Sequence, residues 1–138
     1  MRGALTSIEL DGPAGERSKR SVVWEYTLGT PDSSSPVVMA DHVFMVSDDG
    51  VAKCLDALYG RLQWIKRLKG SNKASPIAAE GRIYFLNQSG LCTVVSANDR
   101  YDKLAENQLP DETLASPAIS DGRVFIRGKK FLWAMGKK

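Results

Sequence analysis

The chain has 138 residues, of which 43% are hydrophobic and 25% are charged, a composition typical of a folded globular protein and not of a disordered tail. Its net charge of +3 comes from 19 basic and 16 acidic residues mixed along the chain, whereas a nucleic-acid-binding protein concentrates basic residues on one face. No run approaches the roughly 18 apolar residues that cross a membrane, and residues 1–10 lack the apolar core of a signal peptide. We therefore expect no nucleic-acid partner and no membrane span.

The first elements in the chain are two strands, at residues 3–10 and 21–28. The second alternates apolar residues, including Trp24 and Tyr26, as a strand with two differently packed faces does. The polar run 11–20 between them is expected to be a hairpin loop and not a linker between domains.

Residues 35–68 form the first complete unit, with four expected strands. It opens on Ser35-Pro36, followed by an apolar triplet, a turn near Asp41 and a β-branched and aromatic pair. Its last strand carries Trp64. The glycine of the second turn, Asp49-Gly50, supplies the backbone conformation that tight hairpins need.

Two later units repeat this pattern, at residues 75–109 and 116–136. Ser-Pro recurs at Ser75 and Ser116, which follow the serine of the first unit by 40 and then 41 residues. The first turn recurs as Glu80-Gly81 and Asp121-Gly122. Trp24 and Trp64 each stand twelve residues before a proline of the series, whereas the third copy has Ala105 in that place.

A period of about 40 residues with four strands in each repeat indicates a β-propeller blade. β-Helix repeats are shorter, and leucine-rich repeats would include a helix. We therefore predict an all-β fold, a partial β-propeller of four-stranded antiparallel blades with two full blades flanked by two partial ones. It is one domain over residues 1–138, with units at 3–28 (the last two strands of a blade), 35–68, 75–109 and 116–136 (three strands).

One segment reads Cys-Leu-Asp-Ala-Leu-Tyr-Gly-Arg-Leu-Gln-Trp and ends at Trp64. It resembles the tryptophan-docking motif of the pyrroloquinoline-quinone-like (PQQ-like) propeller family, which runs Ala-x-Asp-x-x-Thr-Gly-x-x-x-Trp. Asp56, Gly60 and Trp64 match, while Cys54 and Tyr59 replace the alanine and the threonine. The resemblance extends over residues 3–136 and implies that Trp64 docks one blade on the next.

Few residues offer chemistry of their own. His42 is the only histidine, and its repeat equivalents are arginines, so we expect a solvated turn residue. Cys54 and Cys92 form no CxxC pair, and their equivalents Val94 and Ala52 predict buried free thiols with little chance of a disulfide.

Four further features have similarly plain interpretations. Asp48-Asp49-Gly50 aligns with an ordinary hairpin, so we do not expect a calcium site there. Asn87-Gln88-Ser89 is formally a glycosylation sequon but lies at the same turn, and we interpret it as coincidence. Arg127 takes a strand position held elsewhere by Val46 and Leu86, and it needs a carboxylate partner or an exposed edge. Short basic clusters are expected in solvated turns: Arg17/Lys19/Arg20, Lys66/Arg67/Lys69, Lys129/Lys130 and Lys137/Lys138.

These residues identify no catalytic, cofactor-binding or metal-binding group, and we expect no cofactor. By resemblance, the leading hypothesis is a non-catalytic propeller that binds a protein partner or acts as a scaffold, exported to the periplasm or cell surface as most such propellers are. The alternative is a fragment of a quinone-dependent alcohol or sugar dehydrogenase whose cofactor site lies outside this chain. A third reading is a degenerate product without a role.

Two full and two partial blades cannot close a ring of four to eight. Either the chain is the C-terminal part of a longer propeller with further blades upstream, or copies associate to complete a ring. We favour the first, because residue 1 falls inside a repeat and residue 138 follows a third strand.

Overall fold

The computed structural model describes residues 3–10 and 21–136. The expected loop at 11–20, with the Arg17/Lys19/Arg20 cluster, and the terminal Lys137/Lys138 pair lie outside the described residues. The strands are β1 (Leu5–Ile8), β2 (Val22–Tyr26), β3 (Val37–Met39), β4 (His42–Val46), β5 (Val51–Asp56), β6 (Leu62–Arg67), β7 (Ile77–Ala79), β8 (Arg82–Leu86), β9 (Leu91–Ser96), β10 (Lys103–Gln108), β11 (Ala118–Ser120), β12 (Arg123–Arg127) and β13 (Leu132–Gly136). Within the described ranges we find no apolar helix of the length that would cross a bilayer.

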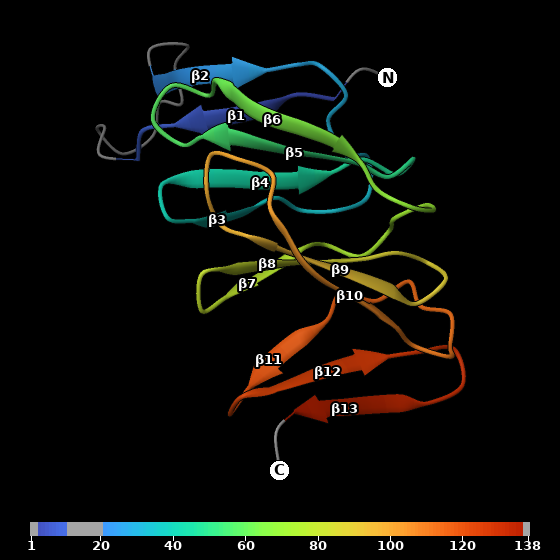
Figure 1. The fold of residues 1–138 in the computed structure, drawn as a ribbon. Coiled ribbons are helices and arrows are strands. Elements are labelled where there is room, and N and C mark those ends of the chain that lie inside the picture. Colours follow the sequence, from blue (N-terminus) through green and yellow to red (C-terminus); the bar gives the residue numbers. More distant parts are fainter. Residues whose placement is uncertain (1–2, 11–20, 137–138) are drawn as a thin grey trace.

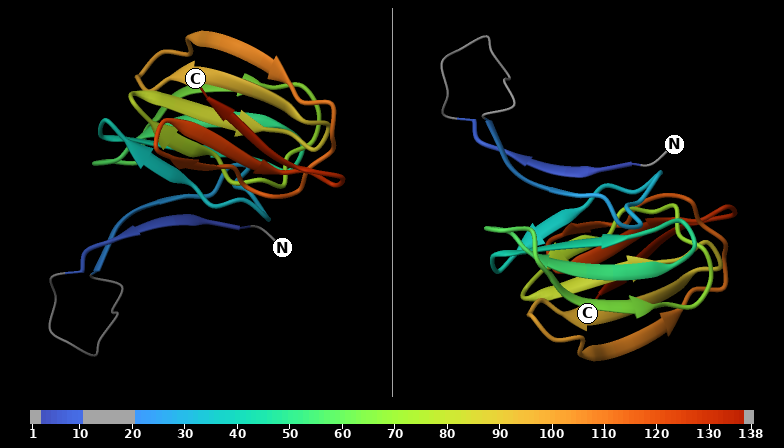
Figure 2. Two further views of the ribbon diagram at one scale, coloured as in Figure 1. Left: turned by 90° about the horizontal axis from the view of Figure 1, so that it is seen from below. Right: turned by 90° about the horizontal axis from the view of Figure 1, so that it is seen from above.

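The strands form four antiparallel sheets in which neighbours in sequence are neighbours in space. The sheets are β1-β2, β3-β4-β5-β6, β7-β8-β9-β10 and β11-β12-β13. Figure 1 shows them one below another in chain order, and the two views of Figure 2 show the β1-β2 hairpin projecting to one side of the other three sheets. This arrangement confirms the predicted all-β fold, a partial propeller with open ends.

The first two strands are shorter than the expected ranges 3–10 and 21–28. A register shift between Ser7 and Ile8 disturbs the pairing near the end of β1. Beyond β2, Gly29 adopts a φ of +60°, which turns the chain out of the sheet. Extended alternation in the sequence therefore continues past the last residues that pair.

The turns between the first and second strands of each sheet have the expected chemistry. Both central residues have positive φ in each case, with 51° and 59° at Ala40 and Asp41, and 50° and 72° at Glu80 and Gly81. This is the pattern of type I′ hairpins, whose twist matches that of the strands. Asp121 and its glycine repeat it.

Apolar side chains fill the seams between consecutive sheets. The largest cluster joins Phe44 and Trp64 of one sheet to Ile83 and Phe85 of the next. A second joins the β7-β10 sheet to the β11-β13 sheet through Leu86 and Ile126 and their neighbours. A third packs β1 and β2 on the β3-β6 sheet. Burial of these faces holds the blades against one another.

Tryptophans on the outer strands anchor two of these seams. The Trp24 indole N–H donates to the carbonyl of Ala57, 2.9 Å away in the next sheet. The Trp64 indole N–H donates to the carbonyl of Asn98 at 3.2 Å, and its ring meets Tyr101 edge-on at a centroid distance of 5.3 Å. The structure thus confirms the docking role expected for Trp64.

The motif around Asp56 has a second role that the sequence did not reveal. Asp56 accepts the backbone N–H groups of Tyr59 and Arg61, at 2.6 and 2.9 Å, and so fixes the loop after β5. Gly60 in this loop lies against the indole of Trp24, where a Cβ atom would come within 2.5 Å of the ring. The aspartate and glycine therefore build the platform for the tryptophan of the preceding sheet, whereas the tryptophan of the same motif docks on the following one.

Candidate functional site

One end of the stacked sheets is formed by connecting loops that contact one another, and we call it the hairpin face. It consists of the hairpins at residues 47–50, 87–90 and 128–131 and the connections between sheets at 68–74 and 109–115. Backbone hydrogen bonds tie each connection to the hairpins of adjoining sheets, as in Asn72 N–H to Asp48 O at 3.0 Å and Thr113 N–H to Gln88 O at 3.0 Å. The loops are therefore positioned by the seams beneath them.

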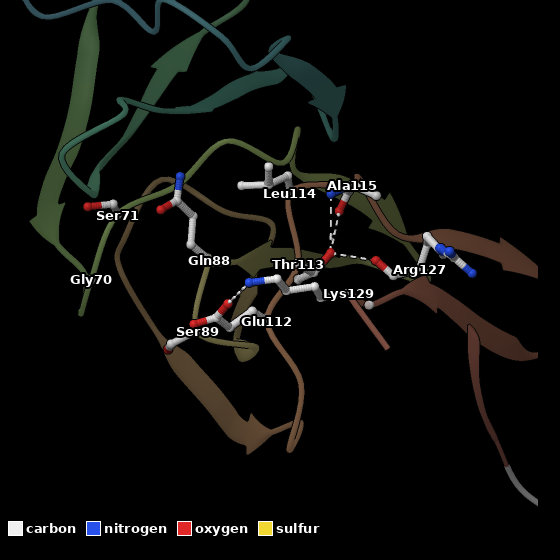
Figure 3. Close-up of a pocket in the computed structure, with 11 residues that line it drawn as sticks. Gly70, Ser71, Gln88, Ser89, Glu112, Thr113, Leu114, Ala115, Arg127 and Lys129 are labelled. Atoms are coloured by element: carbon white, nitrogen blue, oxygen red, sulfur yellow. Dashed lines mark hydrogen bonds and ion pairs between the residues drawn. The ribbon is translucent and has the colours of Figure 1, made fainter. Parts of the chain in front are cut away.

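A pocket of about 670 Å³ opens in the hairpin face between the β7-β10 and β11-β13 sheets. Figure 3 shows the residues that line it. They are Gly70, Ser71, Gln88, Ser89, Glu112, Thr113, Leu114, Ala115, Arg127, Gly128 and Lys129.

The character of the pocket is mixed. Among its lining residues, Lys129 Nζ and Glu112 Oε2 form an ion pair at 3.3 Å. Ser71, Gln88, Ser89 and Thr113 add hydroxyl and amide groups. Leu114 is 69% exposed and provides an apolar surface. The lining therefore combines hydrogen-bonding hydroxyl and amide groups with one exposed apolar side chain.

The pocket opens at this seam because two side chains that close the preceding seam are replaced. There, Asp48 accepts from the Ser33 hydroxyl at 2.8 Å and pairs with Lys73. At the seam that holds the pocket, Gln88 and Leu114 occupy the positions of Asp48 and Lys73. An amide and a leucine form no ion pair, so these two side chains do not close the space between the loops.

A buried aspartate consolidates the same seam. Asp111 is 7% exposed, and its carboxylate accepts the N–H groups of Lys130 and Phe131 and the indole N–H of Trp133, all at 3.1 Å to Oδ2. Burial acts to raise the pKa of Asp111, but these hydrogen bonds outweigh it and lower the pKa below its ordinary value.

The seams on the two sides of the β7-β10 sheet fill an equivalent space with side chains from opposite sheets. Asp111 lies against Gly128 of the next sheet. At the preceding seam the equivalent pair is Gly70 and Asn87, and here the Asn87 amide crosses back to donate to the carbonyl of Lys69 at 2.7 Å. One side chain fills the space in each seam, and a glycine makes room for it. Ala105 stands where the two earlier sheets have a docking tryptophan, and at this seam Asp111 and Trp133 supply contacts that the sequence pattern did not show.

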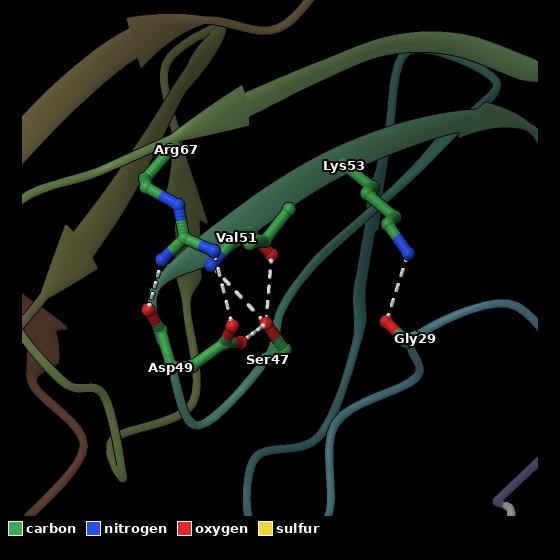
Figure 4. A network of polar contacts seen from close by, with 6 residues as sticks. All are labelled: Gly29, Ser47, Asp49, Val51, Lys53 and Arg67. Atoms are coloured by element: carbon green, nitrogen blue, oxygen red, sulfur yellow. Dashed lines mark hydrogen bonds and ion pairs between the residues drawn. The ribbon is translucent and has the colours of Figure 1, made fainter.

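The Asp48-Asp49-Gly50 hairpin is occupied by protein contacts. Figure 4 shows Asp49 bound to Arg67, with Nη2 and Oδ2 3.2 Å apart, and to the Ser47 hydroxyl. These bonds, led by that of Ser47, lower the pKa of Asp49. Further along β5, Lys53 is buried, and its ammonium group donates to the carbonyl of Gly29 at 2.9 Å, which ties the first sheet to the second.

The residues singled out in the sequence are scattered. His42 Nδ1 lies 2.6 Å from the carbonyl of Ala40 in its own turn. Cys54 and Cys92 are free thiols, Cys54 buried and Cys92 half-buried. Burial raises the pKa of Cys54 to about 12 and that of Cys92 to about 11, so neither thiol is poised as a nucleophile.

Asn87 and Arg127 lie at opposite extremes of burial. Asn87 is 5% exposed with its amide hydrogen-bonded, which supports the interpretation of the sequon as coincidence. Arg127 is exposed and forms no ion pair with a described residue; its backbone borders the pocket, while its guanidinium points away from Gln88 and Ser71. In the part of the chain that the structure describes, no group of three or more His, Cys, Asp or Glu side chains could hold a metal ion.

Comparison with known proteins agrees with this geometry. The sequence profile described as outer membrane protein assembly factor BamB matches residues 14–104, which is 91 of 138 residues. The chain belongs to the BamB family of PQQ-like propellers. No relative was found among curated protein sequences.

Solved structures of a BamB and of two dehydrogenases are similar to this chain in fold. BamB from Moraxella catarrhalis superposes with a TM-score of 0.70 at 17% identity, over 85% of this chain and 37% of that one. Quinohemoprotein alcohol dehydrogenase ADHIIG from Pseudomonas putida HK5 gives 0.64 at 16% identity, over 80% and 20%. A europium-containing methanol dehydrogenase gives 0.54 at 14% identity, over 62% and 18%. The chain thus spans less than two fifths of each of these proteins.

Proposed function

We propose that this BamB-family chain is a non-catalytic binding module that holds a segment of another polypeptide in the pocket of the hairpin face. The pocket itself carries the proposal: it is lined by hydroxyl and amide groups with an exposed Leu114, and its Glu112–Lys129 charges already pair with each other. Loops held by rigid blades are the usual place for binding in a propeller.

The family description supports the same proposal. Members are described as outer membrane protein assembly factors, which suggests contact with other proteins in general. We extend this only to the class of partner, an unfolded or extended protein segment. The groups at the pocket, Ser71, Gln88 and Ser89, can donate to and accept from peptide bonds without selecting a charge.

The experiment closes the pocket by copying the neighbouring seam. In a Gln88→Asp, Leu114→Lys double variant, the new side chains should pair as Asp48 and Lys73 do. We expect binding of an unfolded outer-membrane β-barrel protein, diluted from urea and followed by fluorescence anisotropy, to weaken at least tenfold, while the thermal midpoint of the variant is unchanged.

The matched control makes the same two changes at the opposite end of the sheets, as Gln63→Asp with Leu58→Lys, since both side chains are exposed there. It should bind as the parent does. Equal affinity of all three proteins, or an equal loss in both variants, would exclude the pocket as the binding site.

The dehydrogenase alternative requires a quinone and a calcium ion, and calcium takes about six to eight oxygen ligands. The described residues do not provide a set of ligands for a quinone with a calcium ion. The innermost strands β3, β7 and β11 contribute aliphatic residues, Met39 and Ser120, and no acidic cluster lies beside them. Because that alternative places the cofactor site outside this chain, the test is a titration with pyrroloquinoline quinone and Ca²⁺, followed by quinone absorbance, of a longer protein that contains this chain.

A further inference from the structure

Two polar side chains of the pocket have no hydrogen-bond partner among the described residues. They are the hydroxyl of Ser71, in the connection between β6 and β7, and the carboxamide of Gln88, in the hairpin between β8 and β9. The backbones of the two residues are joined, because the Gln88 N–H donates to the Ser71 carbonyl at 2.8 Å. The two side chains therefore start from neighbouring points of the pocket (Figure 3).

The other polar side chains that line the pocket are already bonded within the protein. The Thr113 hydroxyl donates to a backbone carbonyl at 2.8 Å, and the Ser89 hydroxyl donates to a side-chain carbonyl of its own hairpin, also at 2.8 Å. Lys129 is paired with Glu112. A ligand can therefore hydrogen-bond to the hydroxyl and the carboxamide of the first two residues without breaking a contact inside the protein.

The next repeat has a different arrangement at the same two positions. Ser71 and Gln88 correspond, 41 residues later, to Glu112 and Lys129, whose backbones are joined by the equivalent hydrogen bond at 2.7 Å. There the two side chains pair with each other, whereas Ser71 and Gln88 form no such bond. The fold thus holds two polar groups side by side at this seam and leaves both available to a ligand.

These groups match the chemistry of a peptide backbone. A carboxamide offers both an N–H donor and an oxygen acceptor, and the N–H and C=O groups of one residue in an extended chain point to the same side. One Gln88 side chain can therefore bind both groups, while the Ser71 hydroxyl serves a further backbone group. Leu114, which is 69% exposed, offers contact to an aliphatic side chain of the same segment.

The charges around the pocket restrict the side chains of that segment. Glu112 and Lys129 compensate each other, and the guanidinium of Arg127 is directed away from Gln88 and Ser71 (Figure 3). A charged side chain that entered the pocket would lose hydration without gaining an ion partner, unless it broke the existing pair. An aliphatic side chain avoids this cost.

We propose that Gln88 clamps the backbone of an extended segment, with Ser71 beside it and an uncharged, aliphatic side chain of the segment on Leu114. This inference rests on the proposed function and deepens it, because it states what the same pocket selects. Recognition of a backbone with one aliphatic contact accepts many sequences, but it disfavours a charge at the position that faces Leu114.

The probe is a fluorescein-labelled nonapeptide of glycine, alanine and serine residues with one central leucine, and fluorescence anisotropy measures its binding to the full chain. We expect Gln88→Met, which keeps the length of the side chain but removes its polar groups, to weaken binding about tenfold. Replacing the central leucine of the peptide by glutamate or by lysine should weaken binding to the parent by about as much. Gln63→Met, the same change at the opposite end of the sheets, should bind as the parent does.

A methylated peptide separates backbone recognition from a general loss of affinity. Methyl groups on the two backbone nitrogens nearest the central leucine remove N–H donors to the Gln88 oxygen. The parent should bind this peptide about tenfold more weakly than the unmodified one, whereas Gln88→Met should bind the two alike, because effects on groups in contact are not additive. An equal loss in both proteins would overturn the clamp, as would a Gln88→Met variant that binds the unmodified peptide as tightly as the parent.

The Gln88→Asp, Leu114→Lys variant distinguishes this inference from the proposed function. If this closed variant loses binding while Gln88→Met retains it, the pocket binds the segment without the clamp, and only the inference fails. If the closed variant binds the probe as the parent does, or the parent does not bind it, the proposed function fails as well. Gln88 is half-exposed, so Gln88→Met should fold, as its thermal midpoint would verify.

Discussion

The backbone N–H of Ser35 donates to the hydroxyl oxygen of Ser75, 2.8 Å away and 40 residues further along the chain. The N–H of Ser75 donates in the same way to Ser116, also at 2.8 Å. The serines of the second and third Ser-Pro pairs are thus acceptors for the preceding unit, and two hydrogen bonds join the segments that lead into β3, β7 and β11. This explains why serine, and not another small residue, precedes the repeated prolines.

Replacing Ser75 by alanine should leave the Ser35 N–H without its acceptor. We expect the free energy of unfolding to fall by about 1 kcal/mol, the usual contribution of one such bond, and the Ser35 amide to exchange with solvent faster. Hydrogen exchange followed by NMR measures both. Ser71→Ala is the control, because the Ser71 hydroxyl has no hydrogen bond to a described residue; a similar loss there would mean that the ladder contributes nothing specific.

The Trp64→Ala variant tests the docking of one sheet on the next. Trp64 is 8% exposed, packs on Phe44 and Tyr101 and donates to the Asn98 carbonyl. Loss of this ring should cost about 3–5 kcal/mol, seen as a lower midpoint in urea unfolding. Trp64→Phe keeps much of the packing but loses the N–H donor, so it should fall between the variant and the parent. An unchanged midpoint for Trp64→Ala would contradict the docking role.

Two glycines with the same backbone conformation separate strain from packing. Gly60 and Gly81 have φ values of +70° and +72°, so alanine at either should cost about 1–2 kcal/mol in backbone strain. A Cβ atom at Gly81 meets nothing within 4 Å, whereas one at Gly60 runs into the Trp24 ring. Gly60→Ala should therefore lower the thermal midpoint clearly more than Gly81→Ala. Equal losses would show that Gly60 is not the platform for Trp24.

Asp111 predicts a stability change in acid. Its pKa is lower in the folded chain than the ordinary value of 3.8, so its stabilisation is present in full above that value and is lost as the pH falls through it toward the folded pKa. Asp111→Asn should destabilise the chain at pH 7 and reduce the steepness of the loss between about pH 5 and pH 2. Urea unfolding at several pH values measures this.

Glu112→Gln is the matched control for Asp111→Asn. Glu112 is the next residue, and its ion pair with Lys129 is exposed on both sides, so little change is expected at any pH. If Asp111→Asn followed the pH profile of the parent, the carboxylate would not be the group responsible.

Much of the fold followed from the sequence because its signals are local. Positive φ at the Glu80-Gly81 turn and strand alternation around Trp24 depend on residues next to one another. The repeat then aligned Arg127 with Val46 and Leu86. This alignment predicted that Arg127 has either a carboxylate partner or an exposed position, and the structure shows the exposed position.

The pocket could not be predicted in this way. It exists because Gln88 and Leu114 stand where Asp48 and Lys73 pair in the preceding seam, and the pairing of these loops depends on contacts between sheets. A connection between sheets has no periodic pattern, so its residues carry no signal that the sequence alone reveals.

The sequence by itself determined the repeat, the antiparallel order of the strands and the burial of Trp64. Only the tertiary structure decided which residues meet across a seam: Gly60 with Trp24, and Asp111 with Gly128 where the preceding seam joins Asn87 to Gly70. The physical reason is that close packing requires the space between two sheets to be filled once. A side chain from either sheet can fill it, and the repeat pattern is indifferent to which one does.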